Sequence, residues 1–551
     1  MKVESNLKSQ LLVIFIGIIL FIPYLGNVHL FDWDEINFAE AAREMIVTGD
    51  YLNVRIDFEP FHEKPPLFIW LQVISMKIFG INEFAARFPN AIIGIITLLV
   101  IFNIGKKLFD FKFGLFWVLT FIGSVLPHFY FKTAIIDPFF NLLMFTGIYF
   151  LYKFFLESNQ KKYLILASVM VALAVVTKGP VGYLLPFLTL AAFLVIKRKS
   201  VKLKFLDFIL FTIISFIPAI LWYIYIFTSI NDGLITEFIN YQIRLLTTGD
   251  AGHEGPFYYH FAVLLIGCFP ASVLILRSFR NQEQNDYSQN SFRIWNIILL
   301  SVVLIVFSLV KTKIVHYSSL AFFPITYLAA LTIYNVSTGK IKWKLSSSIF
   351  LGSIGLIFSL ALFWFPIVLM NIGLFIPKID DEFTREVLKT SVTWSGIEWI
   401  IGVIYFLGLL ISLIFTAYEK FIRGFIILFA TSAISVFLIL PMLAPKIEAY
   451  TQNAPVEFFK SIAQKDVYIA TIGYKSYAPY FYGQKRYDNS KLAKNMSGEE
   501  FEKFLLTGQI DKDAYFSAKL NTGKHLLQEY SDIQLIKIKN GFVFMKRTAK
   551  N

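Results

Sequence analysis

The sequence is poor in cysteine and in charged residues. Among 551 residues there is one cysteine, and Asp, Glu, Lys and Arg together make up 16%. A single cysteine, Cys268, excludes an intramolecular disulfide, and its place inside an apolar segment gives no information on the redox compartment. The scarcity of charge, with 56% hydrophobic residues and 60 phenylalanines, excludes a chain made only of ordinary soluble domains.

Long basic or acidic tails are also missing. The net charge is +13, but Lys and Arg occur in short clusters between apolar segments rather than along one face or one tail. This distribution argues against a nucleic-acid partner and is typical of membrane topology signals. The apolar segments lack the polar alternation of barrel strands, so a membrane β-barrel is excluded.

Apolar runs of about 17 residues or more recur along most of the chain, and each is long enough to cross the bilayer as a helix. The pattern predicts a mainly α polytopic membrane protein with about 13 transmembrane helices. The predicted spans are residues 11–30, 89–105, 113–131, 135–155, 163–177, 181–196, 205–227, 259–276, 294–310, 314–333, 345–370, 397–417 and 423–443.

The loops between these spans alternate in character. One set is short and basic, such as KKLFDFK from residue 106 and KRKSVKLK from residue 197, whereas residues 31–88, 228–258 and 371–396 form longer loops of mixed charge. Because Lys and Arg are enriched in cytoplasmic loops, the sequence predicts a cytoplasmic N-terminus and places the longer loops outside.

The apolar runs stop at Ala444, so we predict a transmembrane catalytic domain over residues 1–443 and a small outer α/β domain over residues 444–551. In the second domain, DVYIATIG and IQLIKIKNGFVFMKR are typical of strands, with a hairpin turn at Asn540 and Gly541. GEEFEKFLLTG is typical of a short helix, and we assign no chemistry to this domain.

The first outer loop, residues 31–88, begins with an acidic pair. Asp34 and Glu35 open a segment of good helix formers that ends near Gly49, which predicts a capped helix on the membrane surface. That structural role is one explanation of Glu35, which also stays a weaker candidate for the site. Asp34 directly follows a span, where an ionised carboxylate is costly unless it has a partner or a function.

The stretch FHEKPPLFIW, residues 61–70, predicts the start of a second interfacial helix that runs to about Phe79, because proline is well suited to the first turn of a helix. Lys64 then stands at a helix N-terminus, a place that attracts anions. The simpler alternative is a Glu63–Lys64 surface ion pair with little energetic effect.

Several motifs occur in an order that resembles a known family. They are DE after the first span, AREMIVTGDYLNVRIDFEPFHEKPPLFIW, INEFAARFPNAI, IIDPFF, TKGPVGYLLP and KTKIVHYSSLAFFP. Their order resembles that of bacterial membrane glycosyltransferases of the GT-C class, and within it the aminoarabinose transferase and protein O-mannosyltransferase group, whose protein mannosyltransferases use dolichyl-phosphate-mannose. The resemblance covers residues 30 to about 330, and beyond it only the architecture matches.

The resemblance implies an inverting transferase that moves a hexose or a pentose from a polyprenyl phosphate carrier, such as undecaprenyl phosphate, to an acceptor. It implies action at the outer face of the bacterial inner membrane, among membrane lipids, without an organic cofactor. Lipid A, an envelope glycan and a protein all stay open as acceptors, and neither motif nor composition specifies the sugar.

The resemblance also implies roles for particular residues. Lys64, Arg244 and Tyr317 match phosphate contacts, which suits a reaction whose leaving phosphate needs cations more than a general acid. Asp34 matches the family's acidic position after the first span, where a base for an acceptor hydroxyl is needed, and Asp137 matches a second acidic position. Each residue also has a simpler explanation. Arg244 can be a loop cation that snorkels to the headgroups, Tyr317 an interfacial tyrosine and Asp137 a helix cap.

The sequence also contains weaker candidates for the site. Lys178, in the turn TKGP, adds positive charge near the predicted site, although a tight outer turn explains the motif equally well. Glu63 matches a position that helps to bind a divalent metal in some relatives. The expected histidine partner before Arg244 is replaced by the stretch NYQ at 240–242; the histidines that remain as possible ligands, each more often a plain polar residue, are His62, His253 and His260.

Three other functions compete with this interpretation. A transporter or lipid-linked sugar flippase also has many spans, but such proteins usually show internal repeats and charged helices near the bilayer midplane. In this chain the charges concentrate in the first outer loop. An O-antigen ligase-like protein typically gathers arginines in one late outer loop, and a scaffold whose working part is the C-terminal domain is the third alternative.

Overall fold

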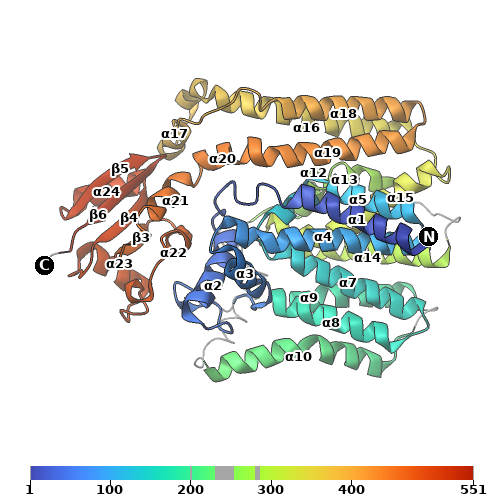
Figure 1. The fold of residues 1–551 in the computed structure, drawn as a ribbon, viewed down its shortest axis with the longest axis horizontal. Coiled ribbons are helices and arrows are strands. Elements are labelled where there is room, and N and C mark those ends of the chain that lie inside the picture. Colours follow the sequence, from blue (N-terminus) through green and yellow to red (C-terminus); the bar gives the residue numbers. More distant parts are fainter. Residues whose placement is uncertain are drawn as a thin grey trace.

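The computed structural model describes residues 2–61, 63–198, 202–229, 254–279, 286–463 and 465–549. Three residues singled out from the sequence, His62, Arg244 and His253, lie outside these ranges. Long helices lie side by side along the long axis of the molecule, and a small sheet domain lies at one end (Figure 1).

The bundle contains the predicted membrane spans. Eight described helices are long and apolar enough to cross a membrane, or ten if each of two bent pairs is one span. The helices of the bundle are α1 (Lys2–Phe21), α4 (Glu83–Leu108), α5 (Phe111–Ile122), α6 (Val125–Phe129), η1 (Tyr130–Lys132), α7 (Asp137–Leu156), α8 (Lys161–Lys178), α9 (Val181–Ile196), α10 (Phe205–Ser229), α12 (Tyr259–Gly267), α13 (Ala271–Leu274), η3 (Ile275–Arg277), α14 (Tyr287–Leu309), η4 (Val315–Ala321), α15 (Phe322–Ser337), α16 (Leu345–Met370), α18 (Ile400–Ala417) and α19 (Phe421–Met442).

Every predicted span overlaps one of these helices or bent pairs, so the mainly α polytopic fold is confirmed, while the total of about 13 crossings stays a prediction. The first boundary is wrong: α1 ends at Phe21 rather than near residue 30. Pro23 explains the early end, because a proline ring disfavours helical conformation in the residue before it.

Two predicted straight spans are bent instead. The axis turns by 84° between α5 and α6–η1, and by 109° between α12 and α13–η3. At the first break a Cβ on Gly123 would lie 2.5 Å from the carbonyl oxygen of Phe429, so only glycine permits this close approach. At the second break Pro270 lacks the amide hydrogen that would continue the helix.

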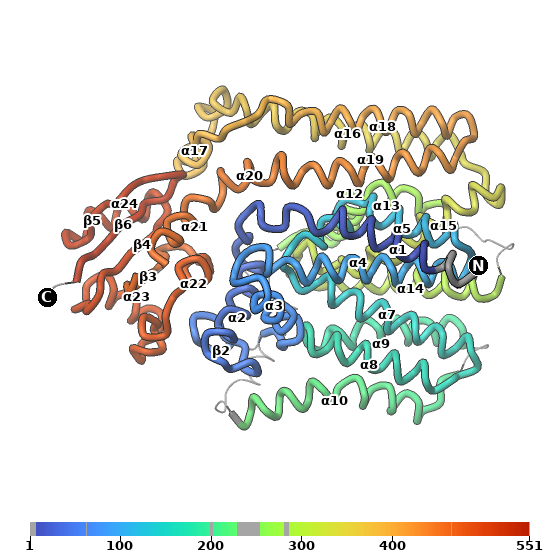
Figure 2. Tube along the Cα trace, in the orientation of Figure 1, coloured from blue at the N-terminus to red at the C-terminus, as the bar shows by residue number. Residues whose placement is uncertain are grey.

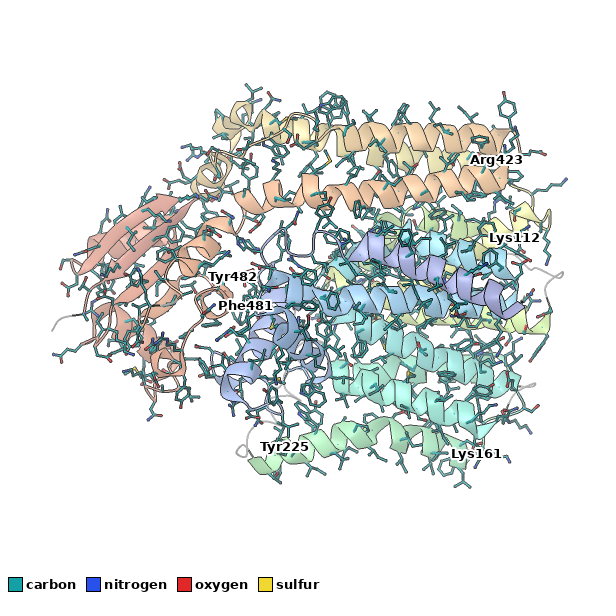
Figure 3. The ribbon with its side chains drawn as sticks, in the orientation of Figure 1. Lys112, Lys161, Tyr225, Arg423, Phe481 and Tyr482 are labelled. Atoms are coloured by element: carbon teal, nitrogen blue, oxygen red, sulfur yellow. The ribbon has the colours of Figure 1, made fainter. Side chains whose placement is uncertain are left out.

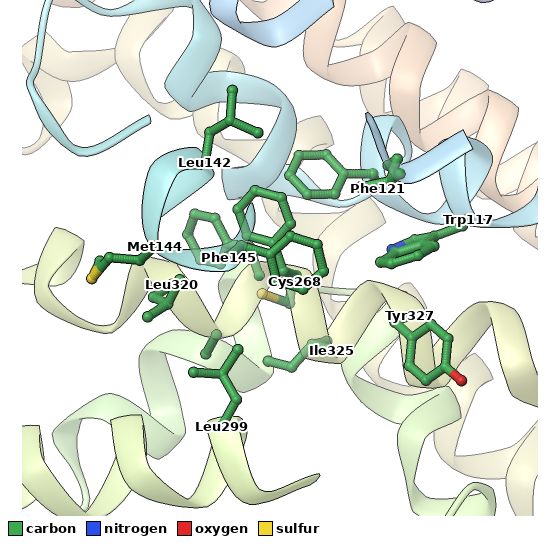
Figure 4. Close-up of a cluster of buried hydrophobic side chains, with 14 of the residues drawn as sticks. Trp117, Phe121, Leu142, Met144, Phe145, Cys268, Leu299, Leu320, Ile325 and Tyr327 are labelled. Atoms are coloured by element: carbon green, nitrogen blue, oxygen red, sulfur yellow. The ribbon is translucent and has the colours of Figure 1, made fainter. Parts of the chain in front are cut away.

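Aromatic side chains pack together in the bundle core (Figure 4). The ring of Trp117 lies 5.0 Å from that of Tyr327, and the Trp117 indole donates a hydrogen bond to Thr326 at 3.2 Å. Phe145 stacks on Phe323 at 4.3 Å. Aromatic packing of this kind fixes the relative positions of α5, α7 and α15.

The two ends of the bundle differ. Lys112, Lys161 and Arg423, from three of the basic loops, lie at the end that carries the N-terminus, and the C-terminal domain lies at the other end (Figure 3). This arrangement agrees with the charge pattern of the loops. We call the end that faces the C-terminal domain the domain end.

The first outer loop fills the space between the bundle and the C-terminal domain (Figure 2). It contains α2 (Asp34–Thr48), α3 (Leu67–Phe79) and a short antiparallel pair of strands, β1 (Arg55–Ile56) and β2 (Glu59–Pro60). Both predicted helices are present, and α2 ends at Gly49 with φ 72°, a conformation that favours glycine.

The expected surface position of α2 is wrong, because every residue from Glu35 to Met45 is buried. The helix packs against α22 (Ala478–Phe481) of the C-terminal domain, and Arg43 donates a hydrogen bond to the carbonyl oxygen of Lys485 at 3.3 Å. In α3, by contrast, Ile74 and Ile78 are exposed, as expected for an interfacial helix.

The C-terminal domain has a four-stranded mixed sheet in the order β3-β4-β6-β5, with β3 and β4 parallel. The predicted hairpin is β5–β6 with Asn540 and Gly541 in the turn, both at positive φ. The sequence did not reveal β4 or α24. The elements of this part, with the preceding loop, are η5 (Ile372–Leu374), η6 (Ile376–Lys378), α17 (Glu382–Leu388), α20 (Ala444–Tyr450), α21 (Asn453–Lys460), β3 (Tyr468–Ile472), α22, η7 (Tyr487–Asn489), α23 (Gly498–Thr507), β4 (Ala514–Lys519), α24 (Leu520–Glu529), β5 (Ile533–Lys539) and β6 (Phe542–Arg547).

Candidate active site

A cavity of about 600 Å³ lies where the first outer loop meets the helix ends of the bundle. Its charged lining comes from loop positions and from the first or last turns of helices, and much of its apolar lining comes from α7, α9, α10 and the last turn of α14. The ionisable and amide side chains in the described lining are Asp34, Lys64, Asp137, Asn141, Lys178, Tyr183, His316 and Tyr317.

Asp34 is the first residue of α2 and follows Trp33, whose φ of 76° turns the chain sharply into the helix. The Asp34 side chain is 44% exposed, so its carboxylate is open to the cavity. His316 Nε2, in η4, lies 3.6 Å from Asp34 Oδ2. The acidic position predicted after the first span therefore faces a cavity and has a titratable neighbour.

Asp137 and Lys178 form an ion pair in the cavity wall. Asp137 is the first residue of α7 and Lys178 the last residue of α8, and Lys178 Nζ lies 2.5 Å from Asp137 Oδ1. The ammonium also lies 5.7 Å from the centre of the Tyr317 ring. Since both charges are largely buried, removal of one partner would leave the other without compensation.

Lys64 lies in the turn before α3 and lines the same cavity. Burial lowers the pKa of the Lys64 amine below its usual range, and the Glu63 carboxylate acts in the opposite direction. The amine also feels the charges of Asp34 and Asp137. Lys64 thus supplies a cation at the point where the outer loop closes over the helix ends.

Tyr317 follows His316 in η4 and packs against Phe307 of α14, with ring centres 5.4 Å apart. It is half-buried and lines the cavity between the charged residues and the apolar turns of the spans. This position allows the Tyr317 hydroxyl to contact a polar part of a ligand at the boundary between water and the apolar helix turns.

Glu35 has a different place from its neighbour. Its two oxygens bind Arg87 of α4, at 2.9 Å to Nε and 2.7 Å to Nη2, and one of them also accepts a hydrogen bond from the amide of Ala134 at 2.7 Å. Among the described residues, the cavity lining does not include Glu35 or Glu63. The acidic pair is therefore divided between the cavity and a buried ion pair.

The possible metal position at Glu63 stays a prediction, because His62 and His253 lie outside the described residues. Within the described ranges, no group of three or more His, Cys, Asp and Glu side chains is placed to hold a metal ion. His260, a possible ligand by sequence, is buried with Nδ1 3.0 Å from Ser318 Oγ. We therefore derive no step through a metal.

His316 is the residue of the cavity that sequence reasoning missed. It stands in KTKIVHYSS beside Tyr317, and an ionisable side chain at the start of an apolar span was the available signal. Its partner Asp34 lies far away in the sequence, so the pairing itself could not be predicted.

Comparisons with known proteins agree with this architecture. The family model for dolichyl-phosphate-mannose-protein mannosyltransferase matches residues 63–222. The undecaprenyl phosphate-alpha-4-amino-4-deoxy-L-arabinose arabinosyl transferase of Wigglesworthia glossinidia brevipalpis is 26% identical over 370 residues, which cover 65% of this chain and 65% of that protein. The alignment thus spans slightly less than two thirds of that relative's length.

Two solved structures share the fold over almost their whole length. ArnT from Cupriavidus metallidurans in the apo state superposes with a TM-score of 0.76 at 15% identity, covering 99% of both chains. The structure of the same protein bound to undecaprenyl phosphate gives 0.76 at 16% identity, covering 98% of both chains.

The fold is therefore that of the solved ArnT structures. The chain resembles the GT-C glycosyltransferases of the aminoarabinose transferase and protein mannosyltransferase group, which confirms the resemblance predicted from the motifs. The matches support a lipid-linked glycosyltransferase.

Proposed function

We propose that this protein transfers a sugar from a polyprenyl phosphate donor to an acceptor in the cavity at the domain end of the bundle. The observation that carries the proposal is the meeting of Asp34, Lys64 and Tyr317 with the Asp137–Lys178 pair around one cavity of about 600 Å³. These residues come from separate segments of the chain, and apolar helix turns continue the cavity away from them.

The cations suit the departing phosphate. Lys178 is held by Asp137 at 2.5 Å, whereas Lys64 stands at the loop side of the cavity, so we assign Lys64 to the phosphate and Lys178 to a supporting charge. Tyr317 and Arg244 complete the phosphate contacts in this proposal. Cations fixed before the reaction stabilise the charge that develops as the glycosyl–oxygen bond breaks.

Asp34 suits the acceptor. Its exposed carboxylate is placed to take the proton of a hydroxyl that attacks the anomeric carbon from the side opposite the phosphate, which inverts the configuration. Asp137, predicted from the sequence as a second catalytic acid, acts in this proposal through its ion pair with Lys178.

The proposal places the cavity at the outer face of the bacterial inner membrane. The N-terminus is then cytoplasmic and the C-terminal domain outside, as the basic loops predict. A hexose or a pentose is the transferred group, and the acceptor is a lipid such as lipid A, an envelope glycan or a protein.

Comparison of glycolipids and glycoproteins by mass spectrometry, in cells that make or lack the protein, tests the proposal and identifies the product. Substitution of Lys64→Ala should lower transfer by about 10²- to 10³-fold, the usual effect of removing one contact to a developing charge. Lys77→Ala is the matched control, because Lys77 belongs to the same outer loop but packs over the Tyr51 ring at 4.4 Å.

Full transfer by the Lys64→Ala variant, produced at a normal level in the membrane, would refute the proposed site. The same assay after chelation of divalent metals tests the family's metal position at Glu63.

A further inference from the structure

His316 is a titratable group of the cavity that has no role in the proposed reaction so far. Its side chain is 16% exposed, and Nε2 lies 3.6 Å from Asp34 Oδ2. The two residues come from η4 and from the first turn of α2. Their side chains meet in the cavity, and His316 immediately precedes Tyr317, with ring centres 5.4 Å apart.

Four charged groups face His316 from the packed elements around it: Asp34 from α2, Lys64 from the turn before α3, Asp137 from α7 and Lys178 from α8. Two of the four are anions and two are cations, so these groups together with an unprotonated His316 have no net charge. A proton on His316 gives the cavity one additional positive charge.

We propose that His316 is the positioning residue for Asp34 and that its protonation shifts the cavity from sugar transfer towards phosphate binding. This inference rests on the proposed function. Nε2 and Oδ2 are 3.6 Å apart, so a shift of a few tenths of an ångström on substrate binding lets neutral His316 donate its Nε2 hydrogen to Asp34 Oδ2. This contact leaves Oδ1 to accept the proton of the acceptor.

The transfer step balances with these groups. The acceptor oxygen forms a bond to the anomeric carbon, and the bond from that carbon to the phosphate oxygen breaks, with its electron pair going to the phosphate. The hydroxyl proton goes to Asp34 Oδ1. His316 keeps its own proton, and its hydrogen bond fixes the carboxylate while the charge changes.

Protonation of His316 has two opposite consequences. An imidazolium beside Asp34 stabilises the carboxylate and makes it a weaker base, so transfer slows on the acid side of neutrality. The same positive charge favours a phosphate beside Tyr317, so a polyprenyl phosphate binds more tightly. A histidine with only a structural role would produce neither effect.

The experiment uses His316→Gln and His316→Phe in the full-length protein. Glutamine retains a donor near the position of Nε2 but gains no proton, whereas phenylalanine retains only the ring. The control is His525→Gln, because His525 also pairs with a carboxylate, Glu529 at 3.2 Å, but lies exposed on the C-terminal domain.

The first measurement is the binding of undecaprenyl phosphate to the purified protein between pH 5.5 and 8.5. Relative to His316→Gln, the unchanged protein should bind about tenfold more tightly at the acid end and equally at the alkaline end. Titration of the lipid phosphate affects both proteins alike and cancels in this ratio.

The second measurement is transfer in native membranes, followed by mass spectrometry of the product. His316→Gln should keep most of the activity at pH 8 and lose the decline towards pH 6, His316→Phe should lose at least tenfold at every pH, and His525→Gln should behave as the unchanged protein.

The outcomes separate the two proposals. If His316→Gln has the same pH dependence of binding and of transfer as the unchanged protein, the role of His316 is overturned and the proposed function stands. If the unchanged protein does not bind undecaprenyl phosphate at any pH, the proposed function fails and this inference fails with it.

Discussion

Asp34 and Glu35 are adjacent in the first turn of α2, but neutralising one should lower activity and neutralising the other should lower stability. Glu35→Gln removes the charge that compensates Arg87, a buried guanidinium that also donates to the carbonyls of Leu25, Val28 and His29 at 2.8 to 2.9 Å. Breaking a buried ion pair by removing one charge costs about 3 to 5 kcal/mol. Because the glutamine amide still accepts a hydrogen bond, we expect about 3 kcal/mol.

Asp34→Asn changes no buried ion pair, because Asp34 is 44% exposed and His316 lies 3.6 Å away. We expect a change in stability below about 1 kcal/mol, as for exposed pairs. If Asp34 is the base, transfer falls by about 10²- to 10⁴-fold. One substitution should therefore remove stability and the other activity.

Both variants can be compared in the same detergent or nanodisc preparation. Thermal unfolding measures stability, and transfer in native membranes below the unfolding temperature measures activity. The reasoning is refuted if Glu35→Gln unfolds at the temperature of the unchanged protein, or if Asp34→Asn retains transfer within a few fold of it.

Three further predictions follow from the ion pairs and from one shifted pKa. Lys178→Met should unfold at a lower temperature than the double variant with Asp137→Asn, because the single change leaves a buried carboxylate unpaired; equal stability of the two would contradict this. Lys485→Met removes the partner of buried Asp57 at 2.7 Å and should make residues 444–551 more sensitive to limited proteolysis than the exposed-site control Lys503→Met. Burial raises the pKa of Glu44 to about 9, so folding favours its protonated form and stability declines as pH rises from about 4.5 to 9; Glu44→Gln should flatten that decline in thermal unfolding curves, and an unchanged slope would refute it.

The features that follow from local pattern were predictable from the sequence. Apolar runs located the spans, because the bilayer imposes a minimum length and excludes charge. Pro66 and Gly49 marked a helix start and a helix end in the outer loop, and Asn540 with Gly541 marked the hairpin turn, since these residues have backbone requirements that depend on nearest neighbours only.

The features that depend on long-range packing were not predictable. The sequence of α2 contains acidic and basic side chains that suit a surface position. Only the tertiary structure shows that the C-terminal domain packs against this helix. The bend at Gly123 follows from the approach of Phe429, far along the chain. The pairing of Asp34 with His316 likewise arises from the packing of η4 against the outer loop.

The C-terminal domain holds the cavity in shape although we assign it no chemistry. Two residues just before Asp34 are tied to it: the amide of Leu30 donates to the Tyr482 hydroxyl at 2.6 Å, and Asp32 Oδ1 accepts from the amide of Tyr477 at 2.9 Å. Tyr482 lies on the side of the domain that faces the bundle (Figure 3). The carboxylate of Asp34 therefore depends on the C-terminal domain for its position, whereas the ion pair opposite it is built on bundle helices. Displacement of the domain would separate the two halves of the cavity without altering any residue in it.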